Sequence, residues 1–277
     1  MKKQVIYSAN AAFQKLEVLK TNRNKRYKYN EFFVEGVRNI NEAVKRGWHI
    51  NSFIYGTEAG LSDWARGVIG STPTRMNYEL SDELMRRLSG KEDTSELMAA
   101  VQMRQDSLDK LVLPANPAIA LFDRPSNKGN LGTVIRSCDS FGMDALLLTG
   151  HAVDLYDPEV ITASMGSFFK VPVIRVEDNN ALYAFFRRMK ERCEGFNIVG
   201  TTAHRQTEIS QVDFTVPTLI MIGNETMGLN AAFKEKCDIL ATIPMSESSS
   251  ASSLNVGCAA TVFMYEICRQ RRQAGLI

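Results

Sequence analysis

The chain has 277 residues, about twice the length of a usual domain, so we expect two domains or one large one. Hydrophobic residues make up 44% of it and charged residues 23%, which excludes a disordered chain, a collagen-like repeat and a disulfide-rich miniprotein. The net charge of +2 conceals a gradient, because residues 1–46 contain eleven Lys and Arg against four acidic residues. This gradient predicts an anionic partner for the amino-terminal part of the chain.

The start of the chain is basic, but no apolar run of seven or more residues follows it. We therefore expect no secretory signal, no transmembrane segment and no membrane partner. The cysteines form no C-x-x-C pair and the three histidines are scattered, so neither a metal site nor a disulfide framework is expected. We interpret the cysteines as small buried side chains in a protein of the reducing cytoplasm. They are Cys138, Cys193, Cys237, Cys258 and Cys268.

Residues 1–112 predict a small α/β domain. Their apolar spacing predicts a helix over 9–20, a strand at 32–34 that turns through Gly36 into a helix ending near 46, a strand over 52–55, and a helix over 81–88 that Ser81 caps. The segment from Lys20 to Lys28 is polar and basic. Pro114 and Pro117 cannot both lie inside a helix or a central strand, so we interpret residues 113–117 as a linker.

In residues 118–277, short apolar strands alternate with amphipathic helices. This alternation predicts an α/β domain with a parallel sheet covered on both faces. The predicted strands are 118–122, 145–149, 171–176, 197–201, 218–223 and 239–243. The predicted helices are 131–140, 158–166, 180–192, 230–236 and 254–272.

Ligands of such sheets bind where the strands end, so the loops that follow strands are the candidate sites. Residues 123–136 contain two glycines and two asparagines and lead into a helix that carries Arg136. Further along, Gly223 and Gly228 bracket Glu225, and a serine-rich stretch leads to Asn255 and an apolar helix. Taken singly, these loops also fit a glycine-capped turn, a solvated carboxylate and a flexible linker.

Together and in this order, the three loops resemble those of the SPOUT RNA methyltransferases of the SpoU/TrmH type. Residues 127–136, 222–229 and 243–256 resemble the family's first, second and third motifs, and residues 161–167 are similar to a further family stretch. Residues 30–115 are similar to the family's substrate-binding domain, best at Phe33-Val34-Glu35-Gly36. The third motif departs from the family pattern, because seven residues without glycine separate Met245 from Ser253.

The resemblance implies a carboxy-terminal knotted parallel-sheet domain (the SPOUT α/β knot) over 118–277 and a smaller ribosomal-protein-like RNA-binding domain over 1–112. A knot is an exception to the rule that chains do not thread through themselves. The resemblance also implies S-adenosyl-L-methionine bound in the knot, a homodimer, and methylation of the ribose 2′-hydroxyl of RNA, with ribosomal RNA favoured.

By the same resemblance, Arg136 is the catalytic residue, surrounded by Asn130, Glu225, Ser253 and Asn255. Because a guanidinium keeps its proton in proteins, we assign Arg136 as a fixed positive charge for the developing alkoxide or the adjacent phosphate. Glu225 either orients that guanidinium or accepts the proton through water, and the sequence leaves both open. The cofactor-binding residues implied are Thr201, Ile222, Gly223, Ile243 and Leu254, and plain core packing is the alternative for Ile243 and Leu254.

The basic segment near the amino terminus suits contact with RNA phosphates, with tyrosines placed for base stacking. Its candidate RNA-binding residues are Lys20, Arg23, Lys25, Arg26 and Lys28, and a solvated arm is the alternative.

Three other functions are compatible with parts of the sequence. A tRNA 2′-O-methyltransferase is the nearest, although the sizeable amino-terminal domain favours a large structured RNA. A non-catalytic RNA-binding or ribosome-assembly protein would not need Arg136, Glu225 and Asn255. A nicotinamide-dependent dehydrogenase would need the G-x-G-x-x-G fingerprint, which the first loop lacks.

Overall fold

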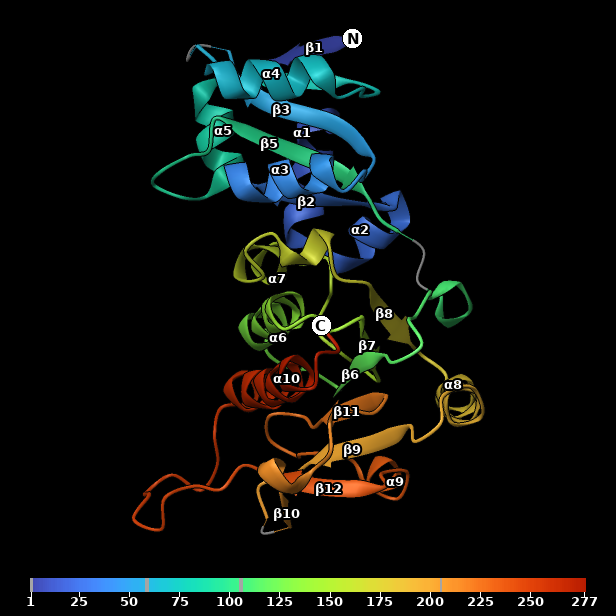
Figure 1. Ribbon diagram of the computed structural model, residues 1–277. Coiled ribbons are helices and arrows are strands. Elements are labelled where there is room, and N and C mark those ends of the chain that lie inside the picture. The colour runs from blue at the N-terminus through green and yellow to red at the C-terminus, as the bar shows by residue number, and fades with distance from the viewer. Residues whose placement is uncertain (1, 58–59, 105–106, 205) are drawn as a thin grey trace. The chain divides into compact units, whose positions relative to one another are not determined.

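The computed structural model describes residues 2–57, 60–104, 107–204 and 206–277. The chain divides into two compact units, Met1–Gln105 with Asp154–Lys170 and Asp106–Val153 with Val171–Ile277 (Figure 1). The units therefore interleave along the sequence, because residues 154–170 follow a strand of the second unit but fold with the first.

The first unit is built on a five-stranded mixed sheet in the order β1-β4-β3-β5-β2. Strand β5 is antiparallel to both of its neighbours, and the other pairs are parallel. The strands are β1 (Lys3–Ile6), β2 (Glu31–Glu35), β3 (Ile50–Gly56), β4 (Asn77–Leu80) and β5 (Leu97–Gln102). The helices are α1 (Ala11–Thr21), α2 (Arg23–Tyr29), α3 (Val37–Lys45), α4 (Asp63–Ser71), α5 (Asp82–Ser89) and α7 (Pro158–Ala163).

Helices cover both faces of this sheet. The apolar faces of α1 and α5 pack on one face, with Phe13, Leu16 and Leu88 buried there. Helices α3 and α4 lie on the other face (Figure 1). The predicted strand–turn–helix through Gly36 is confirmed, and Gly36 has φ +98°, a conformation that favours glycine.

An aromatic cluster holds residues 154–170 in the first unit. Tyr156, Phe168 and Phe169 pack around Phe32 and Trp48, with ring centroids 4.9–6.4 Å from that of Phe32. The Trp48 indole N–H also donates to the carbonyl of Phe169, at 2.9 Å. Burying five aromatic rings together stabilises this packing strongly.

The second unit confirms the predicted parallel sheet. Its seven strands lie in the order β10-β12-β9-β11-β6-β7-β8, and every pair of neighbours is parallel. The strands are β6 (Ala118–Asp123), β7 (Ala145–Thr149), β8 (Val173–Val176), β9 (Asn197–Thr201), β10 (Thr207–Glu208), β11 (Thr218–Ile222) and β12 (Ile239–Thr242). The helices are α6 (Lys128–Ser140), α8 (Asn179–Arg192), α9 (Ala231–Lys234) and α10 (Val256–Gln273).

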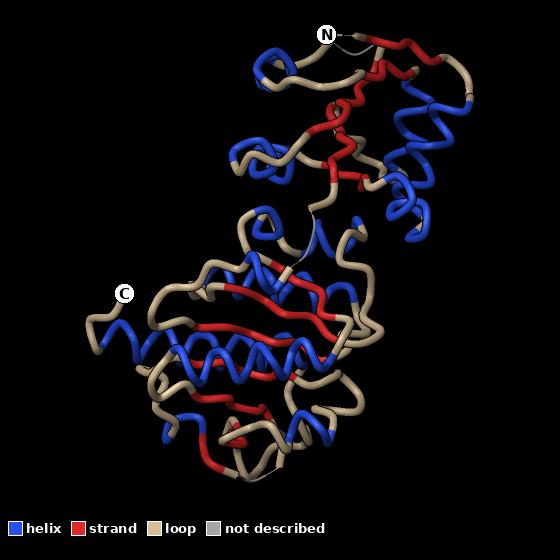
Figure 2. The backbone as a smooth tube through the Cα atoms, turned by 90° about the vertical axis from the view of Figure 1, so that its right-hand side faces the viewer, coloured by secondary structure: helices blue, strands red, loops and turns tan. Residues whose placement is uncertain are grey.

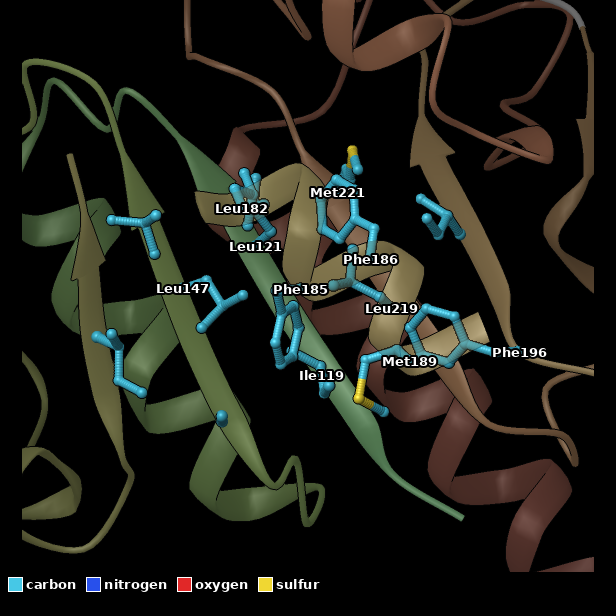
Figure 3. Packing of buried hydrophobic residues seen from close by; sticks show 14 of the residues in the cluster. Ile119, Leu121, Leu147, Leu182, Phe185, Phe186, Met189, Phe196, Leu219 and Met221 are labelled. Carbon is cyan, nitrogen blue, oxygen red and sulfur yellow. The ribbon is translucent and has the colours of Figure 1, made fainter. Parts of the chain in front are cut away.

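Apolar side chains project from both faces of this sheet. Ile119 and Leu121 of β6 join α8 in one buried cluster (Figure 3). Helices α6 and α10 lie on the other face, and Figure 2 shows helices on both sides of the strands. The chain thus returns from β12, near one edge, to α10, which packs on α6, and this is the kind of return that the expected knot requires.

Three details differ from the sequence prediction. The helix expected over 158–166 ends at Ala163, and Met165 and Gly166 then take left-handed conformations before a short 3-10 turn. The last helix begins at Val256 with Asn255 as its cap, so residue 254 precedes it. Strands β1, β4, β5 and β10 and helices α2 and α4 were not predicted, because short or weakly patterned segments take their structure from neighbouring elements.

Three further observations bear on the expected absences. Among the described residues, no helix is both long and apolar enough to span a bilayer. In that same part of the chain, no three His, Cys, Asp or Glu side chains gather as metal ligands. Cys138, Cys193 and Cys268 are buried as expected, but Cys237 is half-buried and Cys258 is exposed, so the interpretation of all five cysteines as buried is wrong for these two.

Candidate active site

The three loops predicted to carry the chemistry follow β6, β11 and β12. Strands β12, β9, β11 and β6 are consecutive in the parallel sheet, so their carboxyl ends lie along the same edge. The loops therefore meet within the second unit, and hydrogen bonds join them directly.

The loop after β11 is a tight, closed turn. Asn224 and Gly228 exchange two backbone hydrogen bonds of 3.0 and 3.1 Å, and the Asn224 side chain accepts from the N–H groups of Thr226 and Met227. A Cβ on Gly223 would lie 2.3 Å from the backbone nitrogen of Leu229, so only glycine permits this closure.

Glu225 projects from that turn and holds the loop after β6. Its carboxylate accepts from the Ser126 N–H at 3.0 Å and hydroxyl at 2.7 Å, and from the Asn127 N–H at 3.1 Å. Burial acts to raise the pKa of Glu225, but the hydrogen bonds from Ser126 and Asn127 outweigh it and keep the pKa below its ordinary value. Glu225 is thus an ionised carboxylate that orders a loop.

Asn130 extends the network to the third loop. Its amide donates to Glu225 at 3.3 Å, and its side-chain oxygen accepts from the amide of Asn255 at 3.2 Å. Asn255 also caps α10 by accepting from the N–H groups of Gly257 and Cys258, as Asn127 caps α6 by accepting from that of Asn130. The structure therefore brings Asn130, Glu225 and Asn255 together, as the sequence predicted.

Arg136 lies on the exposed side of α6. Among the described residues, no hydrogen bond or ion pair engages its guanidinium, so the charge is available to a ligand. Orienting this guanidinium is one of the two roles that the sequence leaves open for Glu225. Among the described residues, the Glu225 carboxylate instead binds Ser126, Asn127 and Asn130 and makes no contact with Arg136.

Helix α10 fixes the position of α6. The hydroxyls of Ser137 and Thr261 are 2.7 Å apart across the two helices, and Phe141 meets Tyr265 edge-on. A Cβ on Gly257 would lie 3.3 Å from the methyl group of Thr133, so glycine allows a close helix crossing at this point. Arg136 therefore projects from a helix that is held rigidly at several points.

The residues expected to bind the cofactor lie along the same edge of the sheet. Thr201 and Ile222 end β9 and β11, Gly223 follows, and Ile243 comes directly after β12. Ile222 is 1% exposed, so only its backbone can face a ligand. Ile243 is half-buried and Leu254 is 41% exposed, so apolar surface is left uncovered. Ser253 is exposed and has no hydrogen bond among the described residues.

The candidate RNA-binding segment is not an extended arm, because residues 23–29 form α2. Arg26 is 1% exposed, and its guanidinium binds Asp154 at 2.6–2.7 Å and the carbonyls of Leu19 and Lys20. Assigning Arg26 to RNA was wrong, since a buried guanidinium with these partners cannot reach a phosphate.

Lys20 is also engaged within the protein. Its ammonium group donates to the carbonyls of Leu88 and Ser89 at the end of α5, and burial lowers its pKa. Arg23 and Lys28 are exposed and Lys25 is half-buried, so these three remain candidates for RNA contact.

Several residues that build the site were not predicted from the sequence. The N–H groups of Ser126 and Asn127 donate hydrogen bonds to the Glu225 carboxylate, and the side-chain amide of Asn224 donates to the carbonyl of Arg124 at 2.7 Å. The signal was present, because polar residues come directly after a buried strand in both loops.

Comparison with known proteins agrees with this geometry. Residues 117–265 match the model of the SpoU rRNA methylase family, and residues 10–99 match that of the SpoU L30e-like domain. The chain belongs to the SpoU rRNA methylase family, which confirms the resemblance and the fold class predicted from the three loops. It is a methyltransferase of that family.

Individual relatives match over nearly their whole lengths. The chain is 40% identical to the 23S rRNA (uridine(2479)-2′-O)-methyltransferase of Streptomyces viridochromogenes, over 96% of this chain and 92% of the relative. It is 26% identical to the 23S rRNA (guanosine(2553)-2′-O)-methyltransferase RlmP of Bacillus subtilis (strain 168), over 96% and 99%. The crystal structure of the SpoU methyltransferase AviRb from Streptomyces viridochromogenes, in complex with the cofactor AdoMet, matches with a TM-score of 0.89 and 39% identity, covering 95% of this chain and 99% of that one.

Proposed function

We propose that this protein transfers a methyl group from S-adenosyl-L-methionine to a ribose 2′-hydroxyl of ribosomal RNA. The observation that carries the proposal is the network of Glu225, Asn130 and Asn255, which joins the three loops at the start of α6, the helix that carries Arg136. Among the described residues, the exposed Arg136 guanidinium has no partner. Two relatives aligned over 96% of the chain are named as 23S rRNA 2′-O-methyltransferases, which supports ribosomal RNA over tRNA.

The residues at the sheet edge fit the cofactor. Half-buried Ile243 and exposed Leu254 offer apolar surface that an adenine ring would cover, and the last residues of β9 and β11 offer backbone groups. When bound, S-adenosyl-L-methionine supplies an activated methyl group on a sulfonium sulfur. The protein's part is to align the acceptor hydroxyl and to stabilise the charge that develops on it.

Arg136 performs the second task in this proposal. Its guanidinium keeps its proton and offers a fixed charge to the developing alkoxide or to the neighbouring phosphate. Among the described residues, five donor groups give hydrogen bonds to the Glu225 carboxylate, and those from Ser126 and Asn127 outweigh burial and hold its pKa low. It therefore acts by holding Ser126 and Asn130 in place, and the hydroxyl proton leaves to solvent or to the RNA.

The amino-terminal domain, over residues 1–112, binds the RNA in this proposal. Exchanging Arg23, Lys25 and Lys28 for glutamate is expected to weaken RNA binding at least about tenfold at low salt and to reduce its salt dependence, because phosphate contacts release counterions. Filter binding at several salt concentrations measures this effect. Cofactor affinity is the control and should not change, and an unaltered RNA affinity would exclude this segment from the interface.

We further propose a homodimer that acts in the cytoplasm, where ribosomal RNA is available. Val262 and Tyr265 on α10 are 37% and 52% exposed, and apolar surface of this kind suits an interface with a second copy.

A methyl-transfer assay tests the function. Radiolabelled S-adenosyl-L-methionine is incubated with the protein and with 23S rRNA, 16S rRNA or tRNA, and the product is mapped by its resistance to alkaline cleavage. Label at one ribose of 23S rRNA is expected. Label on tRNA alone would favour the tRNA alternative, and cofactor binding without transfer to any RNA would favour a non-catalytic RNA-binding protein.

A further inference from the structure

Arg124, directly after β6, has an unusual backbone conformation. Its φ of +49° lies in the left-handed region, which is uncommon for residues other than glycine and is often found at functional sites. Successive side chains of an extended strand point to opposite faces, so neighbours in sequence do not normally pair. The left-handed turn lets Arg124 fold back onto Asp123 and bind both carboxylate oxygens, at 3.0 and 2.8 Å.

Asp123 is 1% exposed and joins three elements. Besides Arg124, its carboxylate accepts from the Thr149 hydroxyl at the end of β7, at 3.0 Å, and from the Asn230 N–H at the start of α9, at 3.3 Å. A buried carboxylate with this many donors is firmly held. The Arg124 guanidinium that pairs with it is therefore fixed in position.

Arg124 in turn contacts both ends of the Asn224–Gly228 turn. Its carbonyl accepts from the Asn224 amide at 2.7 Å, and its guanidinium reaches the carbonyl of Gly228 at 3.5 Å. Gly150 makes room for the side chain, because a Cβ there would lie 2.5 Å from Cγ of Arg124. The turn that carries Glu225 is thus bound at both ends by one residue.

We infer that Arg124 is a positioning residue for methyl transfer, an inference that rests on the proposed function. It binds the Asn224–Gly228 turn to the end of β6, which places Glu225 where it can accept hydrogen bonds from Ser126 and Asn127. Those bonds fix the start of α6, the helix that carries Arg136. The Arg124 guanidinium is occupied by Asp123 and Gly228, so it acts through Glu225 and not on the RNA.

The test replaces the forked guanidinium by a single ammonium. Arg124→Lys keeps a positive charge beside Asp123 but cannot bind both carboxylate oxygens and Gly228 together. We expect the single-turnover rate of methyl transfer, at saturating cofactor and RNA, to fall about 10- to 100-fold, because small errors in alignment cost rates of that size. The KM for RNA and the affinity for S-adenosyl-L-methionine should change less than about threefold.

Gly150→Ala provides an independent variant, which keeps the Arg124 charge but pushes its side chain aside; because Gly150 has φ +62°, the alanine also strains the backbone, so the thermal stability of this variant is measured together with its rate. It should lower the same rate constant, and it carries the test if Arg124→Lys folds poorly. Arg188→Lys is the matched control, because Arg188 pairs with Asp109 on the exposed side of α8, away from the three loops.

Two outcomes would overturn the inference. One is a wild-type rate in both folded variants. The other is a loss of rate that is fully accounted for by the fraction of unfolded protein, as measured by thermal melting. A failed proposed function is distinguishable, because wild-type protein and Arg188→Lys would then also transfer no methyl group to RNA.

Discussion

Arg136→Ala is expected to lower the rate of methyl transfer about 100- to 1,000-fold, the usual cost of removing one fixed electrostatic group from a developing oxyanion. The guanidinium has no partner among the described residues and projects from a helix that Thr261, Tyr265 and Gly257 of α10 hold in place. Truncation therefore removes a charge without breaking an internal contact, and stability should change little.

Single-turnover assays with labelled S-adenosyl-L-methionine measure this loss, and calorimetry measures cofactor binding, which should be nearly unaltered. Arg188→Ala, on the exposed side of α8, is the control for loss of an arginine from the same unit. A rate of methyl transfer for Arg136→Ala within about threefold of the wild-type rate would contradict the assignment of Arg136 as the catalytic residue.

Arg26→Ala is expected to destabilise the first unit by about 3–5 kcal/mol, because removing one partner of a buried ion pair leaves the other charge uncompensated. Asp154 would remain buried without a cation, keeping Tyr27 and the Tyr156 N–H as its donors among the described residues, and two carbonyls would lose the Arg26 guanidinium. Trp48 and Trp64, the two tryptophans of the chain, both belong to the first unit, so their fluorescence during urea unfolding reports on it selectively.

Lys28→Ala is the matched control, since Lys28 lies on the same helix and is exposed. Its unfolding free energy should change by less than about 0.5 kcal/mol. The double variant Arg26→Met, Asp154→Leu should recover part of the lost stability, because no buried charge then stays unpaired. If Arg26→Ala instead kept its stability and lost RNA affinity, the original assignment of Arg26 to RNA would be restored.

The environments of Arg26 and Arg136 could not be predicted from the sequence. Arg26 and Arg136 are both cations on helices, and no local pattern shows that the first is buried and the second exposed. The difference comes from Asp154, 128 positions away, which lies opposite Arg26. A carboxylate that distant in sequence cannot be assigned to a partner by periodicity or spacing.

The role of Glu225 also depends on residues that are distant in sequence. Its place between Gly223 and Gly228 predicted a functional carboxylate, and the structure does bring it to Asn130 and Asn255. Its role depended on which donors surround it, and those belong to Ser126 and Asn127, about a hundred residues earlier. Their hydrogen bonds set its pKa and make it an organiser of loops.

The sequence by itself determined the alternation of apolar strands and amphipathic helices, the parallel sheet and the three loops at its carboxyl edge. These follow from local rules, since burial on two faces requires continuous apolar strands, and glycine and asparagine are required where the chain turns sharply. Only the tertiary structure decided that residues 154–170 fold with the first unit, that Arg26 is buried and Arg136 exposed, and that Arg124 binds the turn that carries Glu225. Those features depend on contacts between residues far apart in the chain, and the free energy of such contacts is set by burial and by partners that no local pattern records.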